Sequence, residues 1–557
     1  MRFLTFRPRL VECMRGYDRG QFRADLIAGI TVGIVALPLA MAFAIASGVT
    51  PQAGIFTAVI AGFIISAFGG SRVQIGGPTG AFIVIVYGIL TEYGAANLAI
   101  CTVMAGVILL IMGFAGLGQA IKYIPYPVTV GFTSGIAVLI LSTQIKDFFG
   151  LQLEHVPSGF LDKCAALASA AGTTHLPTAL LAAAALALII LWPKKWMRVI
   201  PGTVVALVLG TVAVAVFKLP VETIGTRFGG IPEGLPPLSF PEFSFASLPS
   251  LIQPATTIAL LAAIESLLSA VVADGMIDDR HDSNQELKAQ GLANIVCPLF
   301  GGIAATGAIA RTATNVKSGG RTPIAGITHA VTLLIILLVA APLAKSVPLA
   351  VLAAVLVKVA YNMGEWHHFK RLFKWPRSDA AVFLTTFALT VLFDLTLAVE
   401  VGMVLAAMLF IKRVADTSQI TPVSADNDTE GPHHSLQGRD IPADVQVFRI
   451  LGPFFFGVAD RLETALKRAQ REPKVVILRM RKVTAMDATG LNALENLYEK
   501  LAQKHRRLVI SALQPQPYKA LKKAGFLDRL GQENVCPDID HALQRAQALL
   551  EEGHREK

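Results

Sequence analysis

The stretch Gly69-Gly-Ser-Arg-Val-Gln-Ile-Gly-Gly-Pro-Thr-Gly-Ala-Phe82 places a strand-like run and a glycine cluster between apolar segments. A second stretch, Gly301-Gly-Ile-Ala-Ala-Thr-Gly-Ala-Ile-Ala-Arg-Thr312, repeats the pattern: a Gly-Gly pair, a short run, then Gly-Ala opening a helix. Glycine disfavours a helix interior, so neither stretch is compatible with a continuous helix. We therefore expect two interrupted segments, each followed by a half-helix.

The composition of the 557 residues is typical of a membrane protein. Hydrophobic residues make up 53% of the chain, charged residues only 16%, and the mean hydropathy is +0.57. An ordinary soluble domain is about 25% charged. The 49 Lys and Arg exceed the 39 Asp and Glu by 10, an excess that membrane proteins carry in their cytoplasmic loops. Neither a soluble multidomain enzyme nor a nucleic-acid-binding protein is expected.

Apolar segments that fit a bilayer, which takes about 20 residues for a straight helix, recur throughout residues 24–413. They predict fourteen spans, several of them short. The glycine-rich stretches fall at the third and tenth spans, seven apart, as an inverted repeat of seven plus seven requires. Lys and Arg lie mostly in alternate loops, so both termini are expected in the cytoplasm. The predicted spans are 24–48, 51–68, 79–90, 95–115, 124–146, 177–192, 199–217, 253–274, 289–301, 307–316, 322–342, 346–361, 379–394 and 396–412.

Outside the membrane we expect three parts: a basic cytoplasmic arm over 1–23, a polar linker over 414–442, and a small α/β domain over 443–557. The pair His433–His434 lies in the linker without neighbouring ligands, so a metal site there is not expected. No cofactor is expected either. The cysteines lack the spacing of a disulfide framework or zinc site; they are Cys13, Cys101, Cys164, Cys297 and Cys536.

Two interrupted segments at membrane depth predict a binding site. Non-helical backbone is tolerated there only where protein or a water-filled cavity satisfies its polar groups, and half-helix N-termini attract anions. The alternative is that the glycines only let helices pack closely. Arg311, one turn into the second half-helix, supplies positive charge for an anion or forms a fixed ion pair with Glu265.

Glu265 lies midway along the eighth span. Burial favours its neutral form and a nearby arginine favours its ionised form, so its protonation is a candidate switch that couples a proton to anion uptake. If it stays ionised and paired, it is only part of the scaffold. Glu400 and His329 are weaker candidates.

Several longer motifs carry a family resemblance: Asp25-Leu-Ile-Ala-Gly-Ile-Thr-Val-Gly33, Ala36-Leu-Pro38, Gly76-Gly-Pro-Thr-Gly80, Ala263-Ile-Glu-Ser-Leu267, Ala273-Asp-Gly275 and Arg311-Thr-Ala-Thr-Asn315. With these, nearly the whole chain resembles the SulP family of anion permeases, the bacterial relatives of the animal solute-carrier 26 proteins. Three further runs are similar to its dicarboxylate-transporting branch: Gly131-Phe-Thr-Ser-Gly135, Gln144-Ile-Lys-Asp147 and Thr390-Val-Leu-Phe-Asp394.

The resemblance implies a polytopic α-helical protein of the inner membrane, often a homodimer. A core domain (spans 1–4 and 8–11) would move against a gate domain (spans 5–7 and 12–14) like an elevator. Sodium-coupled members look to use an Asp and hydroxyl groups, whereas this chain has Glu265 and the apolar Ile309, so sodium coupling is not expected. The substrate-binding residues that the resemblance implies are Leu39, Phe43, Thr79, Gly80, Ala81, Ala308, Ile309, Ala310 and Arg311, and the proton-coupling residues are Glu265 and Ser269.

The C-terminal segment is similar to a STAS domain. Met486-Asp-Ala-Thr-Gly490 stands where such domains carry a phosphorylated loop, and Thr489 keeps the hydroxyl group. The resemblance thus implies regulation through Asp487 and Thr489, and a cytoplasmic partner of the domain. The alternative is that both residues simply cap a helix.

Together these patterns predict secondary active transport of small anions, with proton-coupled symport of C4-dicarboxylates such as succinate, fumarate or aspartate as the first hypothesis. A sulfate or bicarbonate transporter of the same fold is the alternative, since half-helix N-termini and one arginine fit several oxyanions. An uncoupled anion channel is a further alternative. A nucleobase–proton symporter shares the repeat, but Arg311 suits an anion better than a neutral ring.

Overall fold

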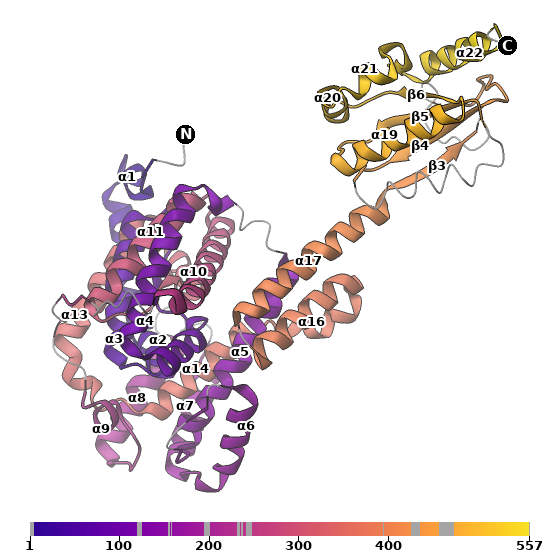
Figure 1. Ribbon diagram of the computed structural model, residues 1–557. Helices are drawn as coiled ribbons and strands as arrows, with labels where there is room; N and C mark the ends of the chain where they lie inside the picture. Colours follow the sequence, from indigo (N-terminus) through magenta and orange to yellow (C-terminus); the bar gives the residue numbers. More distant parts are fainter. Residues whose placement is uncertain are drawn as a thin grey trace. The chain divides into compact units, whose positions relative to one another are not determined.

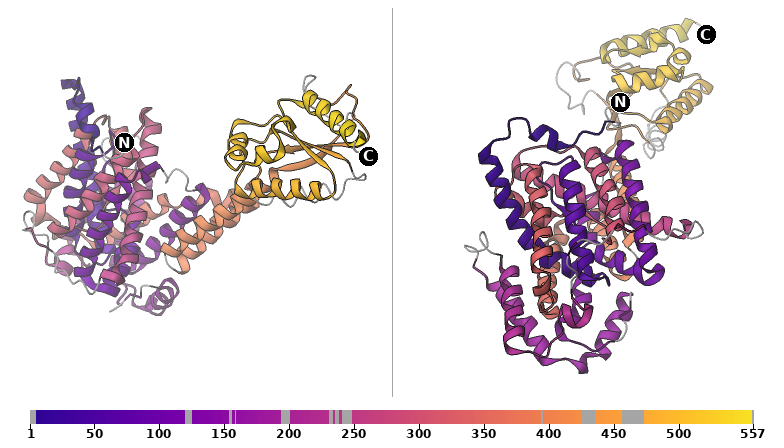
Figure 2. Two further views of the ribbon diagram at one scale, coloured as in Figure 1. Left: turned by 45° about the horizontal axis from the view of Figure 1, so that its top comes forward. Right: turned by 90° about the vertical axis from the view of Figure 1, so that its left-hand side faces the viewer.

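The computed structural model describes residues 5–119, 125–153, 156–157, 159–193, 201–230, 234, 238–240, 248–393, 395–424, 435–455 and 473–555. The chain forms two compact units, Met1–Val404 and Leu405–Lys557. The first is helical and the second combines a sheet with helices (Figures 1 and 2). The pair His433–His434 of the expected linker lies outside the described residues.

Most of the helices that contain the first to fourth and eighth to eleventh predicted spans pack against one another. We call these helices the core group. They are α2 (Arg19–Ala46), α3 (Pro51–Phe68), α4 (Phe82–Phe114), α10 (Leu248–Ile277), α11 (Ser283–Val296), α12 (Ile309–Lys317) and α13 (Pro323–Ala344).

The remaining long helices of the first unit form a second set, which we call the gate group. In it α5 packs against α14 and α16, and α7 packs against α8 and α14. Gly402 of α17 lies against Thr386 of α16. The members are α5 (Tyr126–Phe149), α7 (Leu176–Leu191), α8 (Gly202–Phe217), α14 (Leu349–Met363), α16 (Arg377–Leu392) and α17 (Leu395–Thr417), and shorter helices are α1 (Arg9–Cys13), α6 (Phe160–Ser169), α9 (Ile224–Phe228) and α15 (Trp366–Arg371).

Each predicted span overlaps one of these helices, with two local differences. The third and fourth spans form one element, α4, which is kinked where Gly94 adopts φ 83°. The ninth span stops being α-helical at Val296 and continues as a 3₁₀ turn over Cys297–Phe300. By length and composition, six described segments could cross a membrane: Arg19–Ala46, Pro51–Phe68, Phe82–Phe114, Tyr126–Phe149, Leu248–Ile277 and Leu349–Lys374.

Large apolar side chains are exposed on the outside of the helical unit. Leu191, Phe217 and Val339 are exposed to 78%, 73% and 76%. Water would penalise this surface, whereas lipid tails accept it, so the exposure agrees with a membrane-embedded unit.

The two glycine-rich stretches meet inside the core group. Strand β1 (Gly76–Gly77) pairs antiparallel with β2 (Thr306–Gly307), with Gly76 opposite Gly307. The Ala308 amide extends this pairing by donating to the Ile75 carbonyl at 2.9 Å. The helices that follow, α4 and α12, therefore begin side by side although more than 200 residues separate them in the sequence.

Buried side chains provide hydrogen-bond partners for the non-helical backbone that follows α3. Glu286 of α11 is fully buried. Its Oε2 accepts the amides of Gly70 and Ser71 at 2.9 and 3.2 Å, and its Oε1 accepts Gln74 Nε2 at 3.0 Å. These bonds provide the partners that non-helical backbone needs at membrane depth.

Equivalent partners serve the second stretch. Asn294 of α11 accepts the Ala305 amide at 2.9 Å and donates to its carbonyl at 2.8 Å. Thr57 of α3 accepts the Ile303 amide at 2.8 Å. The polar residues of α11 make this helix less apolar than other membrane spans. Their role is to provide hydrogen-bond partners for the two non-helical stretches.

The second unit is a five-stranded sheet of order β3-β4-β5-β6-β7, parallel except for the antiparallel edge strand β3. Alternate residues of β4 enter opposite apolar layers: Phe448 and Ile450 one layer, Val445 and Val447 the other. The elements are β3 (Gln419–Val423), β4 (Val445–Leu451), β5 (Val475–Lys482), β6 (Arg507–Ser511), β7 (Val535–Cys536), α19 (Ala488–Gln503), α20 (Pro515–Lys523), α21 (Phe526–Leu530) and α22 (Ile539–Arg555).

The expected linker over 414–442 is partly structured, which corrects the sequence-based interpretation. Helix α17 continues to Thr417, and β3 then pairs with β4 over five residues. The strand contains Pro422, which an edge strand tolerates because one side of it needs no hydrogen-bond donors. A short polar edge strand has little hydrophobic pattern, which is why the sequence did not indicate it.

Replacing Gly77 by alanine should destabilise the core group. Gly77 has φ +140°, and an added Cβ would lie 2.4 Å from Arg311 Nη1. The backbone conformation alone costs a non-glycine residue roughly 1–3 kcal/mol. We expect Gly77→Ala to lower the melting temperature of the purified full-length protein. Gly88→Ala, where no atom lies within 4 Å of the added Cβ, is the matched control, and equal melting of both variants would contradict the assignment.

Candidate anion-binding site

The hydroxyl group of Thr79 connects the first half-helix to α10. Thr79 Oγ1 donates to Glu265 Oε2 at 2.8 Å. Thr79 is 4% exposed and Glu265 is partly buried. The β1–β2 pairing positions Thr79, which follows β1 by two residues. The two residues expected to serve substrate and proton are therefore in direct contact.

Helix N-termini frame this contact. The first turn of any helix leaves backbone N–H groups without intrahelical partners, and the helix dipole makes that end attractive to anions. Helix α4 starts beyond Gly80 and Ala81, and α12 starts beyond its N-cap Ala308. At the start of α12, Ile309 is 38% exposed and Ala310 is also exposed, so this end is open to a ligand.

The Arg311 side chain points into the break of the first stretch. It is 3% exposed, its Nη1 donates to the Gly76 carbonyl at 3.2 Å, and its Nη2 donates to the Pro78 carbonyl. Between Arg311 and Glu265 no nitrogen–oxygen distance falls within ion-pair range in the described structure. Arg311 thus holds the backbone in front of α4 and leaves its positive charge beneath the site.

Ser269, expected beside Glu265 as a proton-coupling residue, binds elsewhere. It is fully buried and its Oγ donates to Thr312 Oγ1 at 3.2 Å. The same Thr312 hydroxyl accepts the Ile75 amide at 3.1 Å. Ser269 therefore supports the β1–β2 region, and the structure gives it no contact with Glu265.

Residues of the gate group approach the site across Gly80. A Cβ at Gly80 would lie 3.1 Å from Ile140 of α5, 3.1 Å from Met363 of α14 and 3.4 Å from Phe43 of α2. Phe43 is 6% exposed, and Leu39 one turn earlier is partly buried. The site therefore lies where the core group faces the gate group, with apolar side chains around the polar centre.

His329 of α13 is a buried group that the sequence ranked low. It is fully buried, and neither ring nitrogen has a hydrogen-bond partner among the described residues. The ring lies 3.4 Å from the Cβ position of Gly62, which itself is 3.3 Å from the Gly76 carbonyl. It thus packs behind β1, whereas Glu400 of α17 is exposed.

In the second unit, Asp487 is the N-cap of α19. Its Oδ1 accepts the Gly490 amide at 2.8 Å. Thr489 is exposed in the first helical turn. The geometry accounts for Asp487 as a cap and leaves the Thr489 hydroxyl accessible.

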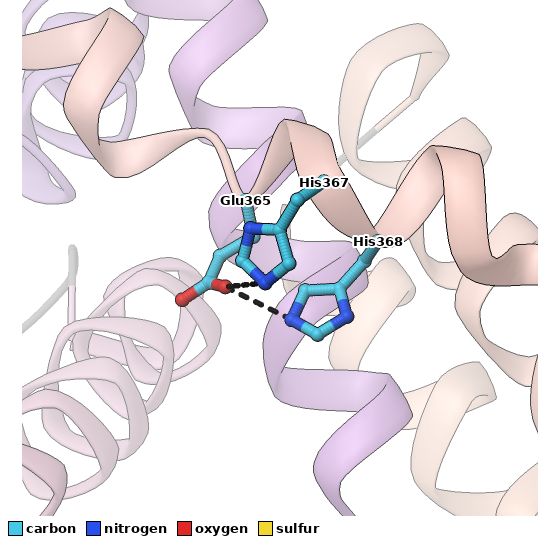
Figure 3. Close-up of side chains that lie close together, drawn as sticks. All are labelled: Glu365, His367 and His368. Carbon is cyan, nitrogen blue, oxygen red and sulfur yellow. Dashed lines mark ion pairs between the residues drawn. The ribbon is translucent and has the colours of Figure 1, made fainter.

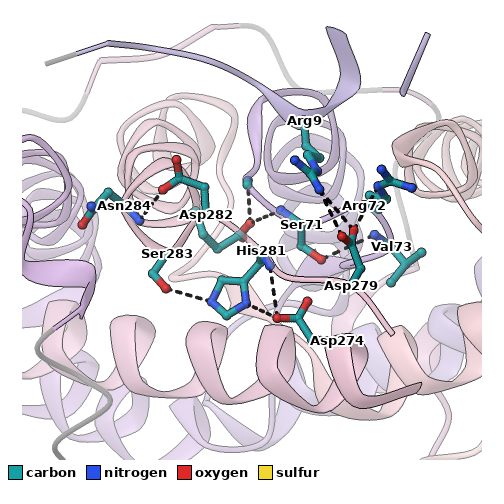
Figure 4. A network of polar contacts seen from close by, with 12 residues as sticks. Arg9, Ser71, Arg72, Val73, Asp274, Asp279, His281, Asp282, Ser283 and Asn284 are labelled. Atoms are coloured by element: carbon teal, nitrogen blue, oxygen red, sulfur yellow. Dashed lines mark hydrogen bonds and ion pairs between the residues drawn. The ribbon is translucent and has the colours of Figure 1, made fainter. Parts of the chain in front are cut away.

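A polar network that the sequence did not reveal joins the N-terminal arm to the end of α10 (Figure 4). Arg9 Nη2 donates to Asp279 Oδ1 at 3.1 Å, and Arg72 Nε binds Asp279 Oδ2 at 2.9 Å. Beside them, His281 Nδ1 lies 2.7 Å from Asp274 Oδ2. The basic arm expected over 1–23 is thus bound to the core group around Arg9.

Comparison with known proteins identifies the family. The model of the sulfate permease family matches residues 22–386, and the STAS domain model matches residues 440–542. The chain belongs to the sulfate permease family. It is a membrane anion transporter with a C-terminal STAS domain, not an enzyme, and its relatives are sulfate and bicarbonate transporters.

Two curated relatives cover nearly the whole permease. The putative sulfate transporter YvdB of Bacillus subtilis is 45% identical over 95% of this chain and 98% of its own length. The bicarbonate transporter BicA of Picosynechococcus is 34% identical over 94% of both chains. Neither relative is named as a transporter of dicarboxylates, the substrate class that we expected first from the sequence.

Solved structures share the fold. The transmembrane domain of a cyanobacterium bicarbonate transporter BicA, 34% identical, superposes with a TM-score of 0.64 over 69% of this chain and 98% of that one. The overall structure of SLC26A9, only 18% identical, superposes with a TM-score of 0.86 over 98% of this chain and 93% of that one. The second likeness concerns the fold alone.

Arg311→Ala should abolish anion binding. The substitution removes the positive charge and leaves the Gly76 and Pro78 carbonyls without their donor, and a buried unsatisfied polar group costs about 1–3 kcal/mol. Arg311→Lys keeps the charge without the planar fork and should retain part of the binding. The measurement is equilibrium binding of radiolabelled sulfate and succinate to purified protein. Arg72→Ala, which removes an arginine from the same stretch but outside the site, is the control; undiminished binding by Arg311→Ala would refute the role.

Proposed function

We propose that this permease is a secondary active transporter that moves a small anion together with a proton across the bacterial inner membrane. The observation that carries the proposal is the contact between Thr79 and Glu265 at the start of a half-helix. Through this contact, a titratable carboxyl group lies one hydrogen bond from Thr79, at the end of α4 where we propose that the anion binds.

The anion would bind between the N-termini of α4 and α12. The free amides from Gly80 to Ala81 and from Ile309 to Ala310 would donate to its oxygens, as helix N-termini do at other anion sites. The charge of Arg311 would offset the negative charge at a distance, because its own donors serve the Gly76 and Pro78 carbonyls. Phe43 and Leu39 would exclude water from one side.

The proton would reside on Glu265. An ionised carboxylate repels an incoming anion, whereas the neutral acid does not, so anion binding favours protonation of Glu265 and protonation favours anion binding. This coupling is reciprocal by linkage. Thr79 acts as a positioning residue: its hydroxyl donates to the ionised form and can accept a hydrogen bond from the neutral form.

The first cargo that we propose is a C4-dicarboxylate such as succinate, on the strength of the runs Gly131–Gly135, Gln144–Asp147 and Thr390–Asp394. Sulfate or bicarbonate is the second candidate, which the names of the relatives favour. All of these are small anions with oxygen acceptors, so the same set of amides fits them. An uncoupled channel would instead show currents that reverse at the anion potential.

Transport would proceed by movement of the core group against the gate group. The nearest gate-group atoms to the Cβ position of Gly80 belong to the apolar side chains of Ile140 and Met363, so this boundary could slide without breaking hydrogen bonds. In our proposal residues 24–413 form the transport domain with both termini in the cytoplasm, residues 443–557 form the STAS domain, and the permease is a homodimer. Phosphorylation of Thr489 and a cytoplasmic partner would act through the STAS domain.

Liposome uptake tests the proposal. Full-length protein would be reconstituted, and uptake of radiolabelled succinate measured with and without an inward proton gradient, with sulfate and bicarbonate as competitors. Accumulation of succinate above equilibrium is the expected result. Gradient-driven transport of sulfate or bicarbonate, without transport of succinate, would contradict the proposed substrate but support proton coupling. Uptake that does not depend on the proton gradient would contradict proton coupling.

Glu265→Gln should uncouple the proton. Glutamine keeps an acceptor for Thr79 but cannot titrate, so gradient-driven accumulation should disappear while exchange of internal for external anion continues. Glu400→Gln changes a second membrane carboxyl group, one outside the site, and should leave accumulation intact. Intact pH-driven accumulation in Glu265→Gln would remove Glu265 from the mechanism.

Removing residues 440–557 should change the transport rate or the assembly state more than the substrate preference, because every residue that we place at the site lies in the helical unit. Uptake rates for succinate and sulfate, together with the oligomeric mass in detergent, should be compared with the intact chain. An altered ratio between the two substrates would contradict this division of roles.

A further inference from the structure

Two histidines and a glutamate converge at the turn between α14 and α15 (Figure 3). The sequence here is Gly364-Glu-Trp-His-His368. Glu365 Oε2 lies 3.0 Å from His368 Nε2 and 3.5 Å from His367 Nε2, and the two imidazole rings are 3.9 Å apart between centroids. This is the one such group with metal-ligand chemistry within the described part of the chain.

The distances fit ligands around a single ion. Zinc bonds imidazole nitrogen and carboxylate oxygen at about 2.0–2.2 Å in tetrahedral geometry, which places neighbouring ligand atoms about 3.3 Å apart. The observed 3.0 and 3.5 Å lie on either side of this value. When both imidazoles carry their proton on Nδ1, all three atoms offer a lone pair to an ion.

One residue of the cluster is buried and the other two are exposed. His368 is 7% exposed; its ring contacts Trp375 at 5.3 Å between centroids, and its Nε2 lies 2.8 Å from the Tyr126 hydroxyl. The side chains of His367 and Glu365 are 60% and 41% exposed. A buried ligand therefore holds the position while the other two leave an approach for an ion and room for a water ligand.

We propose that Glu365, His367 and His368 bind a divalent transition-metal ion of the zinc type, with water in the fourth position. Two imidazoles and one carboxylate favour zinc over magnesium or calcium, which prefer all-oxygen sites. The site joins the end of α14 to α15 and, through His368, to the start of α5. The hydrogen bonds and ion pairs of these three residues in the described structure include neither Glu265 nor Arg311, and the proposed metal site does not depend on the proposed function.

Metal binding would stabilise the gate group through this turn. A ligand that binds only the folded state raises apparent stability by RT ln(1 + [L]/Kd), so zinc should raise the melting temperature of the intact permease. The Tyr126 hydroxyl competes for the His368 Nε2 lone pair. Tyr126→Phe should therefore bind zinc at least as tightly as the unmodified protein.

The test is isothermal titration of ZnCl₂ into full-length, untagged, chelator-treated protein, with MgCl₂ as the reference ion. We expect one saturable zinc site per chain, absent with magnesium, and a melting temperature that rises with zinc. His367→Ala and Glu365→Gln alter exposed side chains and should each weaken zinc binding at least tenfold.

The matched control is His541→Ala. His541 is equally exposed at 60% and pairs with Asp538 at 2.8 Å, and within the described part of the chain no third metal ligand joins this pair. Zinc binding should be unchanged in that variant. The proposal is overturned if the intact protein shows no saturable zinc binding, or if zinc binds His367→Ala and Glu365→Gln as tightly as it binds the intact protein.

Discussion

Backbone that leaves its helical hydrogen bonds inside a membrane must find other partners within the protein, and this constraint organises the transport unit. The chain meets it by pairing β1 with β2 and by directing buried polar side chains at the flanking residues. Glu286 and Asn294 of α11 each serve one of the two breaks. Without these partners, neither α4 nor α12 could begin at the middle of the unit, and no pair of helix N-termini would face a common point.

The same constraint divides roles among the charged residues. Arg311 uses its donors on the Gly76 and Pro78 carbonyls, so it contributes charge and rigidity rather than direct contact. In the site that we propose, direct contact with the anion falls to backbone amides, which would suit several small oxyanions. This explains why a fold shared with sulfate and bicarbonate transporters is compatible with different cargo. Glu265 is hydrogen-bonded only by Thr79 among the described contacts, which is why we propose it as the group that changes its charge.

Features with a strong local pattern could be predicted. The α/β domain over 443–557 was expected, and its strand β4 (Val445–Leu451) has a strong local pattern because apolar residues fill both of its faces. The breaks near Gly76 and Gly307 were expected from glycine chemistry alone. Features with a weak local pattern could not be predicted. The edge strand β3 is short and polar, so it has little hydrophobic pattern. The arm around Arg9 binds Asp279, which lies 270 positions away in the sequence. The bond between Ser269 and Thr312 could not be predicted, because spacing along one helix does not reveal a partner on another helix.

The sequence by itself determined roughly where most of the membrane helices lie along the chain, which unit is apolar enough for a membrane, and which residues are chemically able to bind anions or protons. These properties depend on composition and on periodicity over a few turns. Only the tertiary structure decided which of those residues meet. Thr79 reaches Glu265, while Arg311 faces backbone carbonyls instead, because β1–β2 pairing brings together segments whose separation in sequence carries no information on their distance in space.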